Sequence, residues 1–287
     1  MEHVIASLTE QLPFLSPQLR RAADTLLENP GAIAVNSMRV MAGTAEVSPP
    51  TMLRLAQRLG FPSYEAFRDI FKDQVAGKGY GARAGDLNKA TRREGVAGLV
   101  RDTADAVATG MARFHNPAFA FDVDRAAAII AAAPRTFVIA SGASFGQAVS
   151  FHYVCRMALP VIELASAPGL RAIDCLTSLQ TSDAVLAIAT SPYARSTIEA
   201  AEYARVQGAR ITAVTDSRSS PLGRIAEAAV ILDTEGPHYF PSMIRMAATL
   251  EVLSATIAVK RGPDAVAAIS SYERGIRDSH YYWEDSE

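Results

Sequence analysis

The first 77 residues alternate apolar and polar positions at the spacing of short α-helices. After Ser16, apolar side chains recur every three to four residues until Asn29-Pro30-Gly31, where proline cannot continue a helix and glycine tolerates a turn. The same spacing predicts further helices over residues 37–44, 49–59 and 63–75, with N-caps at Ser37, Ser48 and Ser63. We therefore predict a small all-helical domain over residues 1–77.

The next stretch is rich in glycine and poor in apolar residues. Glycines occupy positions 77, 79, 81 and 85 within residues 76–92, which we interpret as an interdomain linker with bounds at about 78–93. An alanine-rich pattern then predicts a long helix over residues 94–114. After the break at Asn116-Pro117, a second helix is expected over residues 122–133.

From residue 134 the pattern changes to short β-rich runs separated by helical stretches. Strands are predicted over residues 136–140, 161–164, 184–189, 210–215 and 230–232, and helices over residues 145–157, 170–179, 196–207 and 221–228. This alternation favours a parallel sheet that is covered on both faces. Two closing helices, at about residues 242–260 and 264–277, complete an α/β domain over residues 94–287 with its sheet core in 134–260.

The charges are distributed unevenly between the two predicted domains. The chain as a whole has a formal net charge of −2, which excludes a uniformly basic nucleic-acid coat. Residues 1–95 hold 12 basic and 10 acidic side chains, whereas residues 96–287 hold 16 and 20. Within residues 50–93 the count is 9 basic to 4 acidic. The basic surplus therefore lies in and just after the helical domain.

Cysteine usage and hydropathy limit the class of protein. Cys155 and Cys175 form no CxxC pair and have no nearby ligand cluster, so neither a disulfide framework nor a metal site is predicted. We interpret both as small buried side chains in a reducing compartment. The sequence shows no signal peptide and no apolar run of about 18 residues. We expect a cytoplasmic protein that needs no cofactor.

Residues 37–59 have the arrangement of a helix-turn-helix. In its second helix, Met52, Leu55 and Leu59 form one apolar stripe, which turns hydroxyl, amide and guanidinium groups outward. Such groups suit phosphates and base edges in a major groove, although a solvated basic face on an ordinary helical bundle has the same pattern. The candidate DNA-contacting residues are Ser48, Thr51, Arg54, Gln57, Arg58, Arg68 and Lys72.

Three polar loops follow predicted strands of the α/β domain, at residues 141–146, 190–197 and 215–221. Ligands of open parallel sheets bind beyond the carboxyl ends of the strands, where helices begin. Each loop alone is also explained by helix capping, and Ser242 in the later segment 235–242 can cap a helix starting at Met243. The candidate effector-binding residues are Ser141, Ser144, Thr190, Ser191, Tyr193, Arg195, His238 and Ser242.

The helical domain carries a run of residues in a distinctive order. They include Leu26-Leu27-Glu28-Asn29-Pro30, Ser37-Met38, Val47-Ser48, Arg54-Leu55, Leu59-Gly60-Phe61 and Tyr64-Glu65-Ala66-Phe67. Through these residues the domain resembles the N-terminal domain of the RpiR/MurR family of bacterial transcription regulators. One departure is Glu46, where the family usually has glycine at a position of positive φ. We expect a slightly altered turn there, with an acidic residue close to DNA.

Residues 134–260 resemble the SIS (sugar isomerase) domain, which is the C-terminal partner of this helix-turn-helix in the family. The resemblance implies a five-stranded parallel α/β sandwich of flavodoxin-like order, phosphorylated sugars as ligands, and a site at a dimer interface. Gly142-Ala143-Ser144 matches the family's first loop. The family's Ser-x-Ser-Gly-x-Thr falls on residues 189–194, where only Ser191 keeps its place. Losing two hydrogen bonds to a phosphate, each worth roughly 1.5–3 kcal/mol, weakens such a site about a hundredfold or more.

Three functions are compatible with these residues. The first is a transcription regulator, a homodimer or tetramer on a double-stranded operator, whose SIS domain senses a sugar phosphate, a sugar acid or an amino sugar. The alternative is an aldose–ketose isomerase, for which only His238 and Glu235 are pocket-side acid or base candidates. A sugar-binding module with an idle helical domain leaves the basic surplus unexplained. We predict the regulator, with no catalytic residue.

Overall fold

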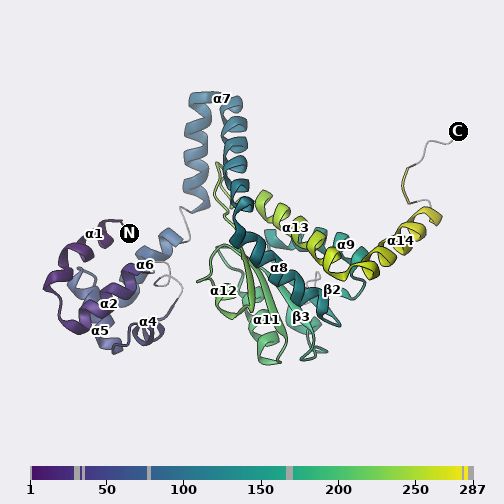
Figure 1. The fold of residues 1–287 in the computed structure, drawn as a ribbon. Helices are drawn as coiled ribbons and strands as arrows, with labels where there is room; N and C mark the ends of the chain where they lie inside the picture. Colours follow the sequence, from purple (N-terminus) through teal and green to yellow (C-terminus); the bar gives the residue numbers. More distant parts are fainter. Residues whose placement is uncertain are drawn as a thin grey trace. The chain divides into compact units, whose positions relative to one another are not determined.

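The fold is described from a computed structural model of the 287-residue chain. The structure describes residues 2–28, 33, 36–75, 79–165, 171–279 and 281–283. They form two compact units, one ending at Asp86 and the other beginning at Leu87, which are described separately (Figure 1).

The first unit is a helical bundle, as its sequence predicts. Its elements are α1 (Glu2–Gln11), η1 (Leu12–Phe14), α2 (Pro17–Glu28), α4 (Met38–Thr44), α5 (Pro49–Arg58) and α6 (Tyr64–Val75). Tyr64, Phe67 and Phe71 on successive turns of α6 are each at most 2% exposed and anchor the core. The predicted caps Ser37 and Ser63 accept hydrogen bonds from the N–H groups three residues on, at 3.4 and 3.1 Å.

The second unit is built on a five-stranded parallel sheet. Its strands β1 (Thr136–Ala140), β2 (Ile162–Leu164), β3 (Ala184–Ile188), β4 (Arg210–Thr215) and β5 (Ala228–Ile231) lie in the order β2-β1-β3-β4-β5. The other elements are α8 (Pro117–Ala132), α9 (Ala143–Ala158), α10 (Ala172–Cys175), α11 (Arg195–Val206), α12 (Pro221–Ile225), α13 (Ile244–Arg261) and α14 (Pro263–Asp278). The order confirms the predicted flavodoxin-like topology.

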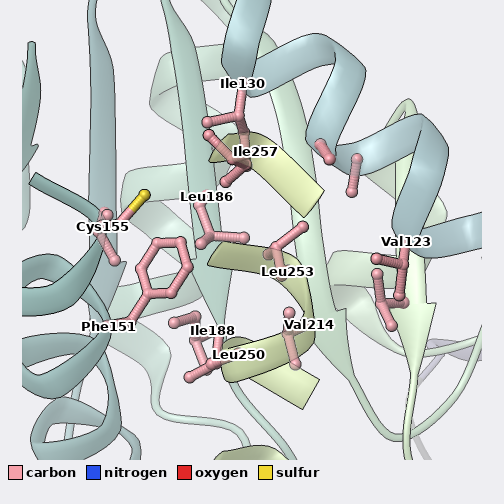
Figure 2. Close-up of a cluster of buried hydrophobic side chains, with 14 of the residues drawn as sticks. Val123, Ile130, Phe151, Cys155, Leu186, Ile188, Val214, Leu250, Leu253 and Ile257 are labelled. Carbon is pink, nitrogen blue, oxygen red and sulfur yellow. The ribbon is translucent and has the colours of Figure 1, made fainter. Parts of the chain in front are cut away.

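Helices cover both faces of the sheet. On one face, side chains of α8, α9 and α13 pack on the strands, where Phe151, Leu186 and Leu253 meet (Figure 2). On the other face, the core joins α11 and α12 to alternate strand residues such as Ile139 and Val185. Because the sheet is buried on both sides, its strands have continuous apolar runs rather than alternating patterns. The core therefore holds the strands in place and leaves their carboxyl ends free for polar loops.

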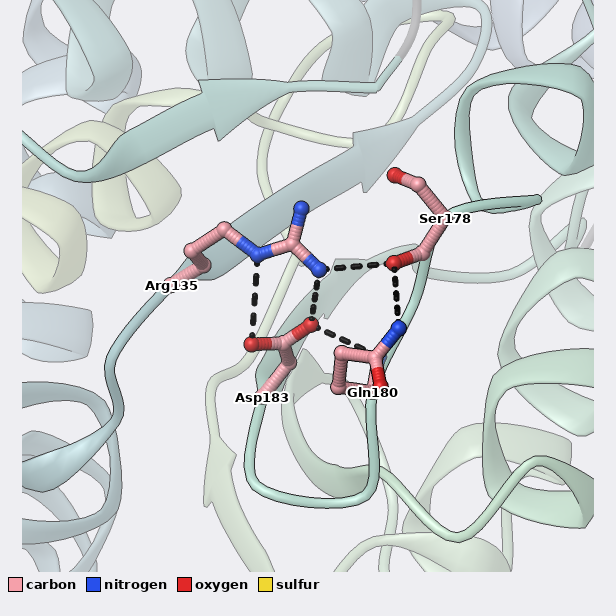
Figure 3. Close-up of polar contacts among 4 residues, drawn as sticks. All are labelled: Arg135, Ser178, Gln180 and Asp183. Atoms are coloured by element: carbon pink, nitrogen blue, oxygen red, sulfur yellow. Dashed lines mark hydrogen bonds and ion pairs between the residues drawn. The ribbon is translucent and has the colours of Figure 1, made fainter.

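An ion pair between the partly exposed Arg135 and the buried Asp183 lies at the opposite, amino-terminal edge of this sheet (Figure 3). Arg135, just before β1, donates through Nη2 to Oδ2 of Asp183 at 2.6 Å and to the carbonyl of Ser178 at 2.7 Å. Asp183, which is 1% exposed, also accepts the N–H of Gln180 at 2.8 Å. This carboxylate raises the pKa of Arg135 through its hydrogen bond. The contacts tie the loop that precedes β3 to the start of β1.

The glycine-rich segment, which the sequence analysis interprets as an interdomain linker, is largely helical. Helix α7 runs over Tyr80–Met111, so most of residues 76–92 is helical, while residues 76–78 lie outside the described residues. Each glycine in a helix costs only about 1 kcal/mol relative to alanine, and the arginine, lysine, leucine and alanine residues between them favour helix. The chain bends instead at Gly95, which has φ 68° (Figure 1). The predicted domain bounds remain a prediction.

Several predicted helix ends also shift. Helix α8 begins at Pro117 rather than residue 122, because Oδ1 of Asn116 accepts the N–H of Ala118 at 2.9 Å and caps it there. Between β2 and β3 the described helix is α10 alone, much shorter than the predicted 170–179. Helix α13 begins at Ile244 with Met243 at its N-cap, so Ser242 does not cap it as predicted. η2 (Ala112–His115) completes the path from α7 to α8.

The cysteines and the helices bear on the predicted class. Cys155 is 1% exposed in the core, and burial raises the pKa of its thiol to about 12, so it is inert as a nucleophile. Cys175 is partly exposed, in contrast to its prediction as a buried residue, and both cysteines are free. Among the helices of the described residues, none combines the length and apolar character needed to cross a bilayer.

Candidate functional site

The predicted helix-turn-helix consists of α4, a turn at residues 45–48 and α5. The turn closes on the hydrogen bond from Val47 N–H to the carbonyl of Ala42, at 2.9 Å. Glu46 has φ 52°, so the left-handed backbone of the turn is kept although glycine is absent. Its side chain is exposed. The turn therefore keeps the backbone region that favours glycine. What differs from the family pattern is that a glutamate adopts it.

The outward face of α5 is narrower than the sequence predicts. Arg54 and Gln57 are exposed, in agreement with the prediction. Thr51 is only 9% exposed, because the buried stripe of α5 is wide enough to include it beside Met52 and Leu55. Its hydroxyl lies 2.9 Å from that of the exposed Ser48. Thr51 thus belongs to the start of α5 and the core, not to an outward-facing surface.

Arg58 is exposed but already engaged within the bundle. Its Nε donates to Oε1 of Gln11 at 3.2 Å, and its Nη2 lies 3.5 Å from the carbonyl of Phe14. These contacts join the end of α5 to α1 and η1. Arg58 therefore helps to hold the bundle together, which sequence spacing did not show. The Arg54 side chain makes no hydrogen bond or ion pair with another described residue.

The two cations predicted on α6 are placed differently. Arg68 is half-buried, and its Nε is buried with no hydrogen-bond partner in the described part of the chain. It lies near Tyr64, whose pKa is raised to about 12 by burial, an effect that the positive charge of Arg68 opposes. Lys72 lies in α6, but its side chain is outside the described residues. The exposed Arg39 in the first turn of α4 is a cation that the sequence analysis missed.

Replacing Glu46 by glycine is expected to raise the free energy of unfolding of the first unit. A non-glycine residue in the left-handed region costs about 1–2 kcal/mol, and the greater freedom of glycine in the unfolded chain offsets about half of that. We expect a gain of up to ~1 kcal/mol by urea unfolding. The matched Glu46→Gln, which removes the charge and keeps the backbone penalty, should stay within about 0.5 kcal/mol of wild type. A Glu46→Gly protein less stable than wild type would contradict this reading of the turn.

At the carboxyl edge of the sheet, hydroxyl groups from two predicted loops meet. Oγ of Ser141, after β1, lies 2.9 Å from that of Ser196 and accepts a hydrogen bond from Oγ1 of Thr197 at 3.0 Å. Strands β1 and β3 are neighbours, so the loops that follow them converge as predicted. Ser144 in the first turn of α9 and Thr190 after β3 are each 7% exposed. These small polar groups line the same edge of the sheet.

Asp216, which follows β4, organises the second loop and was missed as a site residue. Its carboxylate accepts the N–H of Ser191 at 2.9 Å, the hydroxyl of Tyr193 at 2.7 Å and that of Thr215 at 3.3 Å. Burial, and then the Asp216 charge, raises the pKa of Tyr193 above its ordinary value. The Tyr193 phenol therefore holds the loop. The signal in the sequence was an aspartate directly after a strand, in a loop rich in polar residues.

The strand-end loops offer few cations to an anion. Arg195 is exposed at the start of α11, and its only described partner is Glu199, with the nearest nitrogen and oxygen 3.7 Å apart. Arg218 donates to Oδ2 of Asp122 at 2.6 Å, and Arg224 donates to the carbonyl of Ser219 at 2.6 Å. Neither takes the place of the two hydroxyls that the resemblance leads one to expect at residues 189 and 194.

His238 and Ser242 lie in a separate pocket of about 270 Å³. Its walls come from α7, from the segment 235–243 and from the first residues of α13. Nδ1 of His238 accepts the N–H of Phe240 at 3.0 Å, and its ring stacks on Tyr239 with centroids 4.3 Å apart. The N–H of Ser242 donates to the carbonyl of Thr234 at 2.9 Å. The strand-end candidates Ser141, Ser144 and Thr190 do not line this pocket, so the predicted effector residues form two groups.

Metal chemistry has no candidate in the described portion of the chain. No group of three or more histidine, cysteine, aspartate or glutamate side chains is placed there to hold a metal ion. The isomerase alternative rested on His238 and Glu235, which both line the pocket beside α7. The imidazole Nδ1 is occupied by a local hydrogen bond within that loop.

Comparison with known proteins matches each unit to a family. Residues 3–78 match "Helix-turn-helix domain, rpiR family" and residues 129–259 match "SIS domain". The chain is 23% identical over 290 residues to the HTH-type transcriptional regulator HexR of Escherichia coli K12, covering 97% of this chain and 96% of HexR. HexR of Pseudomonas aeruginosa is 24% identical, with 92% of each chain covered.

A solved structure has the same fold over nearly the whole chain. The Vibrio vulnificus NanR protein, complexed with ManNAc-6P, aligns with a TM-score of 0.56 at 18% identity. The alignment covers 96% of this chain and 98% of NanR. Both units described above therefore recur together in one polypeptide elsewhere.

Proposed function

Because the chain belongs to the RpiR family of transcriptional regulators, we propose that it binds an operator through α5 and senses a sugar-related metabolite through its SIS unit. The observation that carries the DNA-binding half is the exposed pair Arg54 and Gln57 on the second helix of the helix-turn-helix. A guanidinium and an amide one turn apart suit the edges of guanine and adenine in a major groove. Arg39 on α4 adds a cation for the phosphate backbone.

The proposed regulator works as an oligomer in the cytoplasm. A two-fold symmetric operator needs two reading helices, and so at least a dimer of this chain. Its relatives HexR are transcriptional regulators, which favours a regulator over the isomerase alternative. Effector binding would then shift the population between states that fit the operator and states that do not.

The sensing half rests on the polar edge of the sheet. The buried hydroxyls of Ser144 and Thr190, with the Ser191 loop held by Asp216, provide neutral donors and acceptors suited to a sugar. NanR carries N-acetylmannosamine 6-phosphate, which supports the sugar-phosphate class for this chain as well. Because Arg218 and Arg224 are engaged within the protein, charge gives no preference for an anionic ligand, so sugar phosphates, sugar acids and amino sugars all belong in a test.

A thermal-shift screen of sugar phosphates, sugar acids and amino sugars tests the sensing half. We expect at least one compound to raise the melting temperature, because a ligand that binds only the folded state stabilises it. Ser144→Ala and Ser191→Ala should each reduce that shift without weakening binding to the protein's own upstream DNA. Ser150→Ala, on the exposed face of the same helix α9 as Ser144, serves as the control. Unchanged ligand shifts in both variants would refute the strand-end site.

A further inference from the structure

The pocket beside α7 lies against the element that connects the two units. Thr103 and Val107 of α7 form one wall, and His238 and Ser242 form another. The boundary between the units falls within α7, between Asp86 and Leu87, so this helix carries the covalent connection from one to the other. The residues of α7 that line the pocket lie in its second half, after the bend at Gly95.

One buried arginine joins the walls of this pocket. Arg245, in the first turn of α13, is 3% exposed. Its Nε donates to the carbonyl of Asp233 at 2.7 Å, its Nη1 to the carbonyl of Ala106 on α7 at 3.1 Å, and its Nη2 to the carbonyl of Glu235. The carboxylate of Asp233 lies 3.4 Å from Nη1 and balances the charge. A single guanidinium thus spans α7, the segment 233–235 and α13.

The surface of α7 is shaped to receive this side chain. Gly110 is buried, and a Cβ atom added to it would overlap the guanidinium of Arg245. By contrast, a Cβ atom added at Gly85, in the first half of the same helix, would meet nothing within 4 Å. Glycine at position 110 is therefore needed for close approach, and its helical φ requires no glycine. Gly110 leaves the space that the Arg245 guanidinium occupies, and Arg245 joins α7 to the segment 233–235.

We propose that Arg245 is a positioning residue that couples occupancy of the pocket beside α7 to the position of α7. The segment 233–242 supplies both the pocket wall and the carbonyls that Arg245 binds, so a ligand that displaces the segment must also move the guanidinium. The guanidinium in turn holds α7 through Ala106. This coupling rests on the proposed function, because it gives a ligand of this second pocket, distinct from the strand-end site, a path by which to alter DNA binding.

The first test compares two glycine substitutions in the full chain by amide hydrogen exchange. Gly110→Ala displaces the Arg245 guanidinium, which occupies the position of the added methyl group. Gly85→Ala makes the same chemical change where nothing lies within 4 Å. We expect Gly110→Ala to speed exchange about tenfold both in residues 99–111 and in the segment 233–242, and Gly85→Ala to speed neither. Faster exchange in only one of the two segments would overturn the coupling. Arg245→Met removes the guanidinium of the same contact and should also speed exchange in both segments.

The second test fills the pocket without knowledge of the ligand. In a Cys175→Ser background, Ser242→Cys places a thiol on the pocket wall, which N-ethylmaleimide then alkylates while Cys155 stays buried. We expect the adduct to change exchange in residues 99–111 at least about threefold when Arg245 is present and not when Arg245→Met is added. If the adduct changes exchange in residues 99–111 in both proteins, or in neither, Arg245 does not transmit occupancy of the pocket to α7.

DNA binding separates this inference from the proposed function. Arg245→Met and Gly110→Ala should weaken binding to the protein's own upstream DNA about tenfold, because a loosened α7 leaves fewer molecules in the operator-binding state. Wild-type affinity in both variants would overturn the regulatory role of the contact between Arg245 and Gly110. If the wild-type chain itself fails to prefer that DNA, the proposed function fails, while the exchange experiments still decide the coupling.

Discussion

Replacing Arg135 by alanine is expected to lower the free energy of unfolding of the SIS unit by about 1–3 kcal/mol, the cost of leaving a buried acceptor without its donor. The substitution leaves the carboxylate of Asp183, which is 1% exposed, without the guanidinium that lies 2.6 Å from it (Figure 3). The carbonyl of Ser178 loses its donor as well. An unpaired buried charge is costly because the protein interior solvates it poorly. Native-state hydrogen exchange of the β3 amides measures the loss.

A matched ion pair in the same sheet provides the control. Arg210, at the start of β4, binds Glu227 at 2.6 Å, but both side chains are more than 40% exposed. Arg210→Ala should cost no more than about 1 kcal/mol, since water solvates what the pair leaves behind. The double variant Arg135→Ala with Asp183→Asn should recover part of the loss by removing the buried charge. Equal effects of Arg135→Ala and Arg210→Ala would show that burial of Asp183 is not the cause.

Replacing Arg54 by alanine is expected to weaken binding to the protein's own upstream DNA roughly 10- to 100-fold, because one well-formed base contact is worth about 1–3 kcal/mol. Arg54 is exposed on α5 and has no described partner within the bundle, so the fold should be unaffected. Arg58→Ala is a poorer test, because it also removes the hydrogen bonds to Gln11 and Phe14. Fluorescence anisotropy with labelled DNA measures the change.

Arg21 on α2 offers the same charge change away from the reading helix. Arg21→Ala should lower the affinity by no more than about threefold through the loss of one positive charge. The dependence of affinity on salt distinguishes whether Arg54 binds a phosphate or a base. If Arg54 binds a phosphate, its removal reduces the slope by about one, whereas if it binds a base, its removal weakens specific binding with little change in slope. Wild-type affinity for Arg54→Ala would remove α5 as the reading helix.

The fold was predictable where local chemistry agrees with tertiary structure. Continuous apolar runs such as Phe137–Ile139 and Val185–Ile188 indicate buried parallel strands. The helices between them are predicted by capping residues and by the helical spacing of apolar positions. The helical conformation of the glycine-rich segment was not predicted, because composition alone does not distinguish a glycine that bends a chain from one that lies within a helix. Gly95 bends α7, whereas Gly85 lies within it.

The site was predictable only in part, because side-chain partners distant in sequence decide it. Thr51 lies beside Met52, and its burial depends on the width of the stripe, which packing against α2 and α4 sets. Arg58 is engaged by residues more than forty positions away. Asp216 and Arg245 hold their loops through hydrogen bonds that no spacing rule reveals. Residue type indicated the polar edge of the sheet, and the structure divided the candidate residues into two groups.

We propose above that one chain couples operator binding to a sugar-related metabolite. The measurement is a titration of full-length protein onto its own upstream DNA, with and without one compound of each class: N-acetylmannosamine 6-phosphate, gluconate and glucosamine. We predict tighter binding than to a scrambled sequence, by a factor of at least about 10³, and a change of about tenfold or more with at least one compound. Equal affinity for the scrambled DNA, or an affinity that no compound alters, would contradict the claim.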